Sequence, residues 1–209
     1  MRLKIFILLL VSSSFCYSQK KGFYTELSLN TSLFSKTNDM DKYMKNKFSD
    51  YNHSFIVSGG IGAAIGYNIT NRFATSIDFS INAGGDFKNL KEKQYKKLEF
   101  STSALSIEYY ILRQENNSLS AKIGIGYENS SFFYSRKEPV DIYSFSYNNI
   151  FMPIAITWWF DNIGLILQYN AVVQKGDAKL TGIDYSFDKS IPNVSINSFS
   201  IGIRSKISL

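Results

Sequence analysis

The chain has 209 residues, of which 44% are hydrophobic and 16% aromatic, and it carries a formal net charge of +6. This mild basic excess falls well short of a nucleic-acid-binding surface, so we expect no nucleic-acid partner. The single cysteine, Cys16, excludes an internal disulfide. Many aromatic residues together with only three prolines favour a β-rich chain.

Residues 1–18 match an export signal. Arg2 and Lys4 form a basic start, residues 5–11 form a short apolar run, and residues 12–18 end on a small residue. An apolar run this short cannot cross a bilayer as a helix, which needs about 20 residues. The bulky Phe15 that precedes Cys16 is atypical of lipoprotein signals. We therefore expect cleavage after Ser18 and one mature domain over 19–209, without a cysteine and with a net charge of about +4.

The mature chain breaks into segments that alternate apolar and polar residues, which is the period of a β-strand. In residues 119–127, for example, Leu119, Ile123 and Tyr127 fall on one face, and Lys122 and Gly124 fall on the other. Eight strands are predicted, near residues 22–34, 54–69, 72–83, 98–112, 119–132, 145–160, 163–174 and 196–209. Pro153 lacks a backbone donor, so we expect a bulge or a change of phase at that position.

The predicted connections alternate in length along the chain. Short polar turns follow the second, fourth and sixth strands, at residues 70–71, 114–118 and 161–162. Long polar connections follow the first, third, fifth and seventh strands, near residues 35–53, 84–97, 133–144 and 175–195. Short turns at one end, long loops at the other and an even strand count are typical of an outer-membrane β-barrel. The expected fold is therefore all-β: an eight-stranded antiparallel up-and-down transmembrane β-barrel with short periplasmic turns and long extracellular loops.

The polar face of the strands decides which side points outward. A soluble barrel also alternates, but its outer surface should be about 25–35% charged. Here the polar face is mostly Gly, Ser, Ala and Asn, which suits a narrow interior. Aromatic residues mark strand ends, as expected for interfacial girdles; they include Phe23–Tyr24, Tyr109–Tyr110 and Trp158–Trp159–Phe160. An aromatic-rich soluble core is the alternative interpretation of these aromatic residues.

The few charges within the strands all fall on the small, polar face. These charged residues are Glu26, Asp78, Glu108, Lys122, Glu128, Arg204 and Lys206. Pairing the strands about their turns sets Glu108 near Lys122, and closing the barrel sets Glu26 near Arg204 or Lys206. We predict interior ion pairs that fill the lumen, with a gated polar path as the functional alternative.

No catalytic, cofactor or metal site is predicted, and we expect no enzyme. The only histidine, His53, lies with Asp50 and Ser54 in or beside a predicted loop, which is poor geometry for a hydrolase. A single histidine and no mature cysteine make a metal site a weak hypothesis. The run Gly59–Gly66 misses the dinucleotide-binding spacing by one residue and lies in a strand. The lysines at 88, 91, 93, 96 and 97 could bind lipopolysaccharide phosphates, although an ordinary solvated loop is favoured.

The hairpin Tyr67–Phe73, the strand Ser120–Tyr127 and the apolar terminal strand resemble small outer-membrane β-barrel proteins of Bacteroidota, including those grouped with PorT, and are broadly similar to OmpX/OmpA-type barrels. The resemblance covers 19–209 and implies location in the outer membrane, with contacts to its lipid and lipopolysaccharide and to the barrel-assembly machinery during insertion. The resemblance assigns no catalytic residue to this chain.

We expect a non-enzymatic integral outer-membrane protein with a structural or surface-interaction role through its extracellular loops. An accessory subunit of a secretion or envelope-assembly machine, as in PorT-like type IX secretion, is the alternative, and an envelope enzyme is least favoured. Because side chains just fill an eight-stranded barrel, a general diffusion pore is not expected.

Overall fold

The computed structural model describes residues 21–34, 46, 57–85, 94–114, 116–137, 140–182, 190–194 and 197–209. The export signal predicted over 1–18 and the loop histidine His53 lie outside these residues. In the described part of the chain, no helix is both long and apolar enough to cross a membrane.

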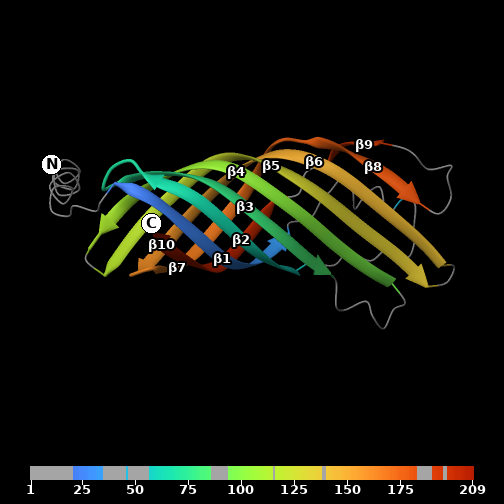
Figure 1. Cartoon of the computed structure of the whole chain (residues 1–209). Helices are drawn as coiled ribbons and strands as arrows, with labels where there is room; N and C mark the ends of the chain where they lie inside the picture. Colours follow the sequence, from blue (N-terminus) through green and yellow to red (C-terminus); the bar gives the residue numbers. More distant parts are fainter. Residues whose placement is uncertain are drawn as a thin grey trace, which may run out of the picture.

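Ten antiparallel strands form one sheet (Figure 1). The strands are β1 (Gly22–Phe34), β2 (Val57–Asn68), β3 (Phe73–Gly85), β4 (Gln94–Arg113), β5 (Asn117–Lys137), β6 (Val140–Phe160), β7 (Ile163–Gln174), β8 (Gly176–Gly182), β9 (Ser190–Val194) and β10 (Ser198–Ser208). The ring runs β5-β4-β3-β2-β1-β10-β7-β6 and closes through β5–β6 pairing. Strands β8 and β9 lie outside the ring, so eight of the ten strands make a closed barrel. This confirms the predicted eight-stranded antiparallel fold.

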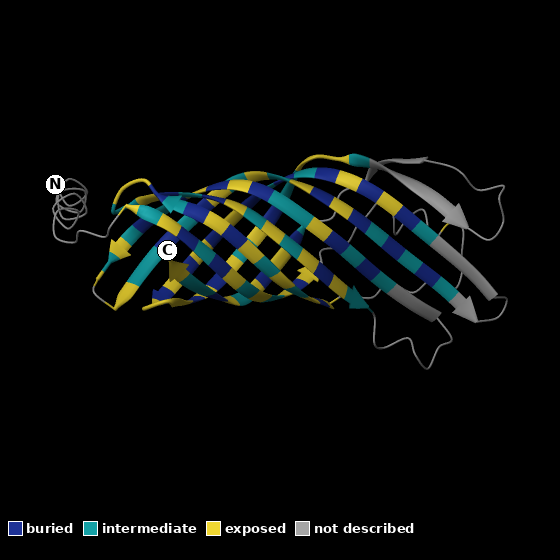
Figure 2. Cartoon of the chain, viewed as in Figure 1, coloured by how far each residue is buried: buried dark blue, intermediate teal, exposed yellow. Residues whose placement is uncertain are grey.

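The pleat separates the two faces of every strand in the ring. Apolar side chains such as Ile123, Leu105 and Ile201 point outward and are more than half exposed, whereas Glu108 on the opposite face is fully buried. Exposed and buried residues therefore alternate along the strands (Figure 2). The period of two that the sequence predicts is the period that the barrel uses to sort its side chains.

Short turns close one end of the barrel. Between β2 and β3, the Thr70 hydroxyl accepts hydrogen bonds from the backbone N–H groups of Arg72, at 3.1 Å, and Phe73, at 3.0 Å. Between β6 and β7, Asp161 adopts a left-handed conformation with φ of 52°, which Asp and Asn tolerate better than most residues. The short-turn end is thus built by the local turn chemistry of a few polar residues.

Strands extend into three of the predicted long loops. Residues 133–144 were expected as a loop, but β5 continues to Lys137 and β6 starts at Val140. β4 starts at Gln94, inside the second predicted loop, and it pairs with β5 up to Gln94–Arg136. The fourth predicted loop, 175–195, contains β8 and β9, and β8 pairs with the outer end of β6. The long-connection end therefore carries a sheet that projects beyond the barrel and is made of β4, β5, β6, β8 and β9 (Figure 1).

The change of phase expected at Pro153 does not occur. Side chains of β6 stay buried at every second position from Phe145 to Trp159, and Pro153 is one of them. The irregularity lies at Ile150–Phe151, where β7 contributes one extra residue, Val173, to the ladder. Pro153 lies where the β5–β6 ladder omits two consecutive pairs, opposite Gly124 and Ile125, so its missing N–H is accommodated without a shift of register.

Candidate functional site

Six of the seven charged side chains predicted to face inward converge in the lumen toward its short-turn end. The seventh, Glu128, is also buried, but it accepts hydrogen bonds from Ser130 and Asn149 outside this group. The six come from five strands: Glu26 from β1, Asp78 from β3, Glu108 from β4, Lys122 from β5, and Arg204 and Lys206 from β10. Five of the six side chains are less than about one-eighth exposed, and Asp78 is partly exposed at 27%. Three carboxylates and three cations make a neutral set, as burial of charge requires.

Glu26 is the acid at the centre of this charge cluster. Its carboxylate oxygens lie 3.4 Å from Arg204 Nη1, 3.6 Å from Lys206 Nζ and 4.0 Å from Lys122 Nζ. Arg204 also donates a hydrogen bond to Glu26 over the same 3.4 Å. Glu26 lies opposite Lys206 across the β1–β10 seam, and the structure brings together the residues that barrel closure places side by side.

The other predicted pair, Glu108 with Lys122, is not an ion pair in the structure. The two residues are direct cross-strand partners, but the Lys122 ammonium lies 2.7 Å from Asp78 Oδ1 on the far side of β4. Glu108 instead lies 3.8 Å from Lys206 Nζ and accepts a hydrogen bond from Ser120 Oγ at 2.5 Å. Long side chains in a narrow lumen reach past their nearest neighbour, so register alone does not fix the partner.

Three aromatic rings enclose the Lys206 ammonium at the short-turn end. Its Nζ lies 3.6 Å from the centroid of Tyr24, 5.3 Å from that of Tyr110 and 5.5 Å from that of Trp159. It also donates a hydrogen bond of 2.6 Å to the Tyr110 hydroxyl. We call this group the Lys206 cage. Cation–π contacts of this kind stabilise a desolvated ammonium by about 2 kcal/mol.

The cage was missed by sequence reasoning, which assigned the aromatic doublets at strand ends to membrane girdles. Neighbouring residues of a strand point to opposite faces, so each doublet is split. Phe23, Tyr109 and Trp158 point outward, whereas Tyr24, Tyr110 and Trp159 are at most 3% exposed and point inward. The period of two, applied to the doublets themselves, would have found the cage.

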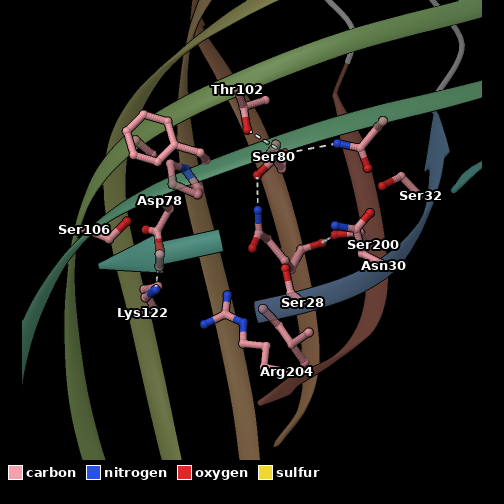
Figure 3. A pocket seen from close by; sticks show the side chains of 18 of the residues that line it. Ser28, Asn30, Ser32, Asp78, Ser80, Thr102, Ser106, Lys122, Ser200 and Arg204 are labelled. Carbon is pink, nitrogen blue, oxygen red and sulfur yellow. Dashed lines mark hydrogen bonds and ion pairs between the residues drawn. The ribbon is translucent and has the colours of Figure 1, made fainter. Parts of the chain in front are cut away.

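Beyond the charge cluster, toward the long-connection end, the lumen holds a polar cavity of about 70 Å³ (Figure 3). Asp78, Lys122 and Arg204 lie on one side of it, and the rest is lined by hydroxyl and amide groups together with apolar side chains such as Phe100 and Ile166. Ser80 Oγ and Thr102 Oγ1 are 2.7 Å apart, and Asn82 donates to Ser80 at 3.0 Å. A cavity of this size holds a few water molecules, whereas a solute path would need a continuous opening.

Outside the lumen, the described residues add no chemical centre. No group of three metal-ligating side chains occurs among them. The glycine-rich run 59–66 lies within β2. Of the basic cluster in the second connection, the structure describes the side chain of Lys97, which forms an ion pair with Glu99. The other four lysine side chains lie outside the described residues.

Neither the protein-family models nor the curated proteins give a match to this chain. Among solved structures, the attachment invasion locus protein Ail of Yersinia pestis, in complex with the heparin analogue sucrose octasulfate, is similar with a TM-score of 0.51 and 10% identity; the likeness covers 90% of this chain and 100% of Ail. The outer membrane protein OprG of Pseudomonas aeruginosa is similar with a TM-score of 0.51 and 10% identity, over 92% of this chain and 99% of OprG. The fold is that of a small outer-membrane β-barrel. At this identity the likeness establishes the fold alone.

Proposed function

We propose that the chain is an integral outer-membrane β-barrel protein without enzymatic activity, with a structural or surface-interaction role at its long-connection end. The observation that carries this proposal is the polarity of the barrel, which has charges inside and apolar side chains outside. Leu27, Ile81 and Leu105 on the outer face are each about 60% exposed. A contiguous apolar surface wrapping a whole barrel is unfavourable in water and favourable in hydrocarbon.

The height of the apolar belt supports the membrane proposal. On β5, the outward side chains are apolar from Leu119 to Tyr127, and polar Asn129 and Ser131 follow. At about 3.3 Å per residue and a tilt of about 40°, this stretch spans about 20 Å, close to the apolar band of about 25 Å in outer-membrane barrels.

Aromatic girdles mark the edges of the belt. At the short-turn end, the ring centroids of Phe23 and Tyr67 lie 5.0 Å apart and those of Phe73 and Tyr109 lie 4.9 Å apart. Tyr127 stands on the outward face at the other edge. Outward rings at these positions fit the membrane–water interface, where amphipathic aromatic side chains are enriched.

The filled lumen supports a role other than diffusion. The charge cluster and the Lys206 cage occupy the short-turn half of the interior, which leaves the projecting sheet of β4, β5, β6, β8 and β9 as the part of the protein available for contacts outside the membrane. Lipid and lipopolysaccharide around the belt, and the barrel-assembly machinery during insertion, are the partners this proposal implies. The proposal includes removal of residues 1–18 on export. It also includes kinship with the PorT-like barrels of Bacteroidota, with a secretion or envelope-assembly subunit as the alternative role.

Two measurements test the proposal. Fractionation of cells should place the protein in the outer membrane as a heat-modifiable band, and purified protein in planar bilayers should give no stable conductance steps. Recovery in a soluble fraction would contradict the membrane location, and nanosiemens steps would contradict the filled lumen. Native co-purification separates the two roles, because a stoichiometric envelope complex would favour the accessory subunit over the lone barrel.

A further inference from the structure

A second hollow, of about 70 Å³, opens at the short-turn end of the barrel, on the opposite side of the Lys206 cage from the lumen cavity. Tyr110, Trp159 and Lys206 contribute to it from the cage, and Arg113 contributes from the end of β4. The remaining lining comes mainly from the two neighbouring turns, including Gln114, Asn116 and Asn162. It is a polar hollow with aromatic and cationic side chains in its wall.

Two cations face this hollow. The Arg113 guanidinium carbon lies 4.3 Å from the centroid of Tyr110, and the same ring system holds Lys206 through its hydroxyl at 2.6 Å. Both cations thus lie within 5.3 Å of the centroid of the Tyr110 ring. A pair of like charges held around one ring is a costly arrangement unless an anion offsets it.

The two cations differ in the carboxylates that lie near them. Lys206 has Glu26 and Glu108 on its lumen side, at 3.6 and 3.8 Å. Arg113 donates a hydrogen bond to the backbone carbonyl of Asn71, and within the part of the chain that the structure describes no carboxylate forms an ion pair with it. Asp161, the one carboxylate among the described residues that line the hollow, has an exposed side chain and no such ion pair with either cation. Among the described residues, Arg113 therefore has no carboxylate within ion-pair distance, and its guanidinium faces the hollow without a direct counterion there.

We propose that this hollow is a binding site for an oxyanion, a carboxylate or phosphate group, held between Arg113 and Lys206. A guanidinium presents a planar fork of donors that matches two oxygens of such a group, and the neighbouring Asn and Gln amides offer further donors. The volume admits a single oxyanion group and not a larger molecule. The group therefore belongs to a small anion or to the end of a longer ligand. Placing that ligand in the periplasm rests on the proposed function, whereas the site itself does not.

Trp159 in the wall of the hollow reports on binding, and W158F leaves it as the only tryptophan of the chain. We would refold W158F in uncharged detergent micelles and titrate it with sodium acetate, sodium phosphate and sodium chloride at matched ionic strength. The expected result is a saturable change in Trp159 fluorescence with acetate or phosphate that chloride does not reproduce. The tighter of the two responses identifies the ligand as a carboxylate or a phosphate.

Variants locate the response. R113Q in the W158F background should weaken the apparent affinity for the anion at least tenfold. R113K keeps the positive charge but lacks the planar pair of guanidinium donors, so its affinity should lie between those of W158F and R113Q. R72Q is the matched control, because Arg72 lies at the same end but donates to Tyr109 outside the hollow, at 2.9 Å, and it should bind as W158F does. Heat-modifiable migration verifies that each variant is folded. A response equal to that of chloride, or unchanged in both Arg113 variants, would overturn the site and leave the membrane proposal untouched.

Discussion

Glu26 is the acid on which three cations of the lumen converge, so its replacement by glutamine tests the charge cluster most sharply. E26Q keeps the shape of the side chain but leaves Asp78 and Glu108 to balance Lys122, Arg204 and Lys206. Leaving a buried charge without its partner costs about 3–5 kcal/mol. The polar cavity beside Arg204 provides partial solvation, so we expect E26Q to lower the free energy of unfolding by about 3 kcal/mol, toward the lower end of that range.

The assay is reversible urea unfolding of the refolded protein in phosphatidylcholine vesicles, followed by tryptophan fluorescence. E26Q/R204Q removes one charge of each sign, and it should recover at least about half of the loss, because contacting residues couple by about 0.5–3 kcal/mol. E99Q is the control, since Glu99 pairs with Lys97 at a side-chain exposure of 44% and surface pairs contribute about 0–1 kcal/mol. If E26Q and E99Q unfolded alike, the cluster would not stabilise the barrel and the reasoning would be refuted.

Three further outcomes follow from the same structure. I123K should lower the free energy of unfolding in vesicles by about 2–4 kcal/mol, because Ile123 faces lipid near the middle of the belt. N129K, above the belt, should change it by no more than about 1 kcal/mol. Equal losses in the two variants would show that the belt has been assigned to the wrong residues. G66A should cost about 1–3 kcal/mol in the same assay, because a Cβ at Gly66 would meet the ring of Tyr24, and an unchanged midpoint would argue against the packed cage. F145A removes a fully buried ring of the projecting sheet, so it should accelerate proteolysis at that end while the barrel core stays protected; uniform protection would show that Phe145 does not hold this sheet.

The strands of the belt could be predicted because lipid and lumen impose opposite polarities on alternate residues. That contrast is strong from Leu119 to Tyr127, where the outer face is apolar and the inner face includes Lys122 and Gly124. This contrast allows the strands to be located in the sequence and their charged side chains to be assigned to the inner face.

Above the belt, the two faces of a strand no longer differ in polarity, so the sequence pattern does not predict where the strands end. Phe132, Phe133 and Tyr134 are consecutive aromatic residues, although the first and third are buried and the second lies on the other face. With water outside, no apolar outer face is required, so strand and loop have similar compositions. The extension of β5 and β6 therefore became visible only from their pairing, up to Lys137 opposite Val140.

The partners within the charge cluster could not be predicted either. Register places Glu108 beside Lys122, but the flexible lysine side chain reaches Asp78 two strands away. Which acid a lumen cation meets depends on the space left by neighbours such as Tyr24 and Trp159, and strand alternation carries no information about that space.

The central claim is that, from Leu119 to Tyr127 of β5, odd-numbered residues face lipid while even-numbered residues face the lumen. Single-cysteine variants from residue 120 to 131, labelled with a fluorophore and reconstituted with brominated lipids, measure this directly, because bromine quenches only nearby fluorophores. The account predicts strong quenching at 121, 123, 125 and 127, weak quenching at the even positions between them, and loss of the alternation from 129 onward. Quenching that is uniform, or strongest at the even positions, would contradict it.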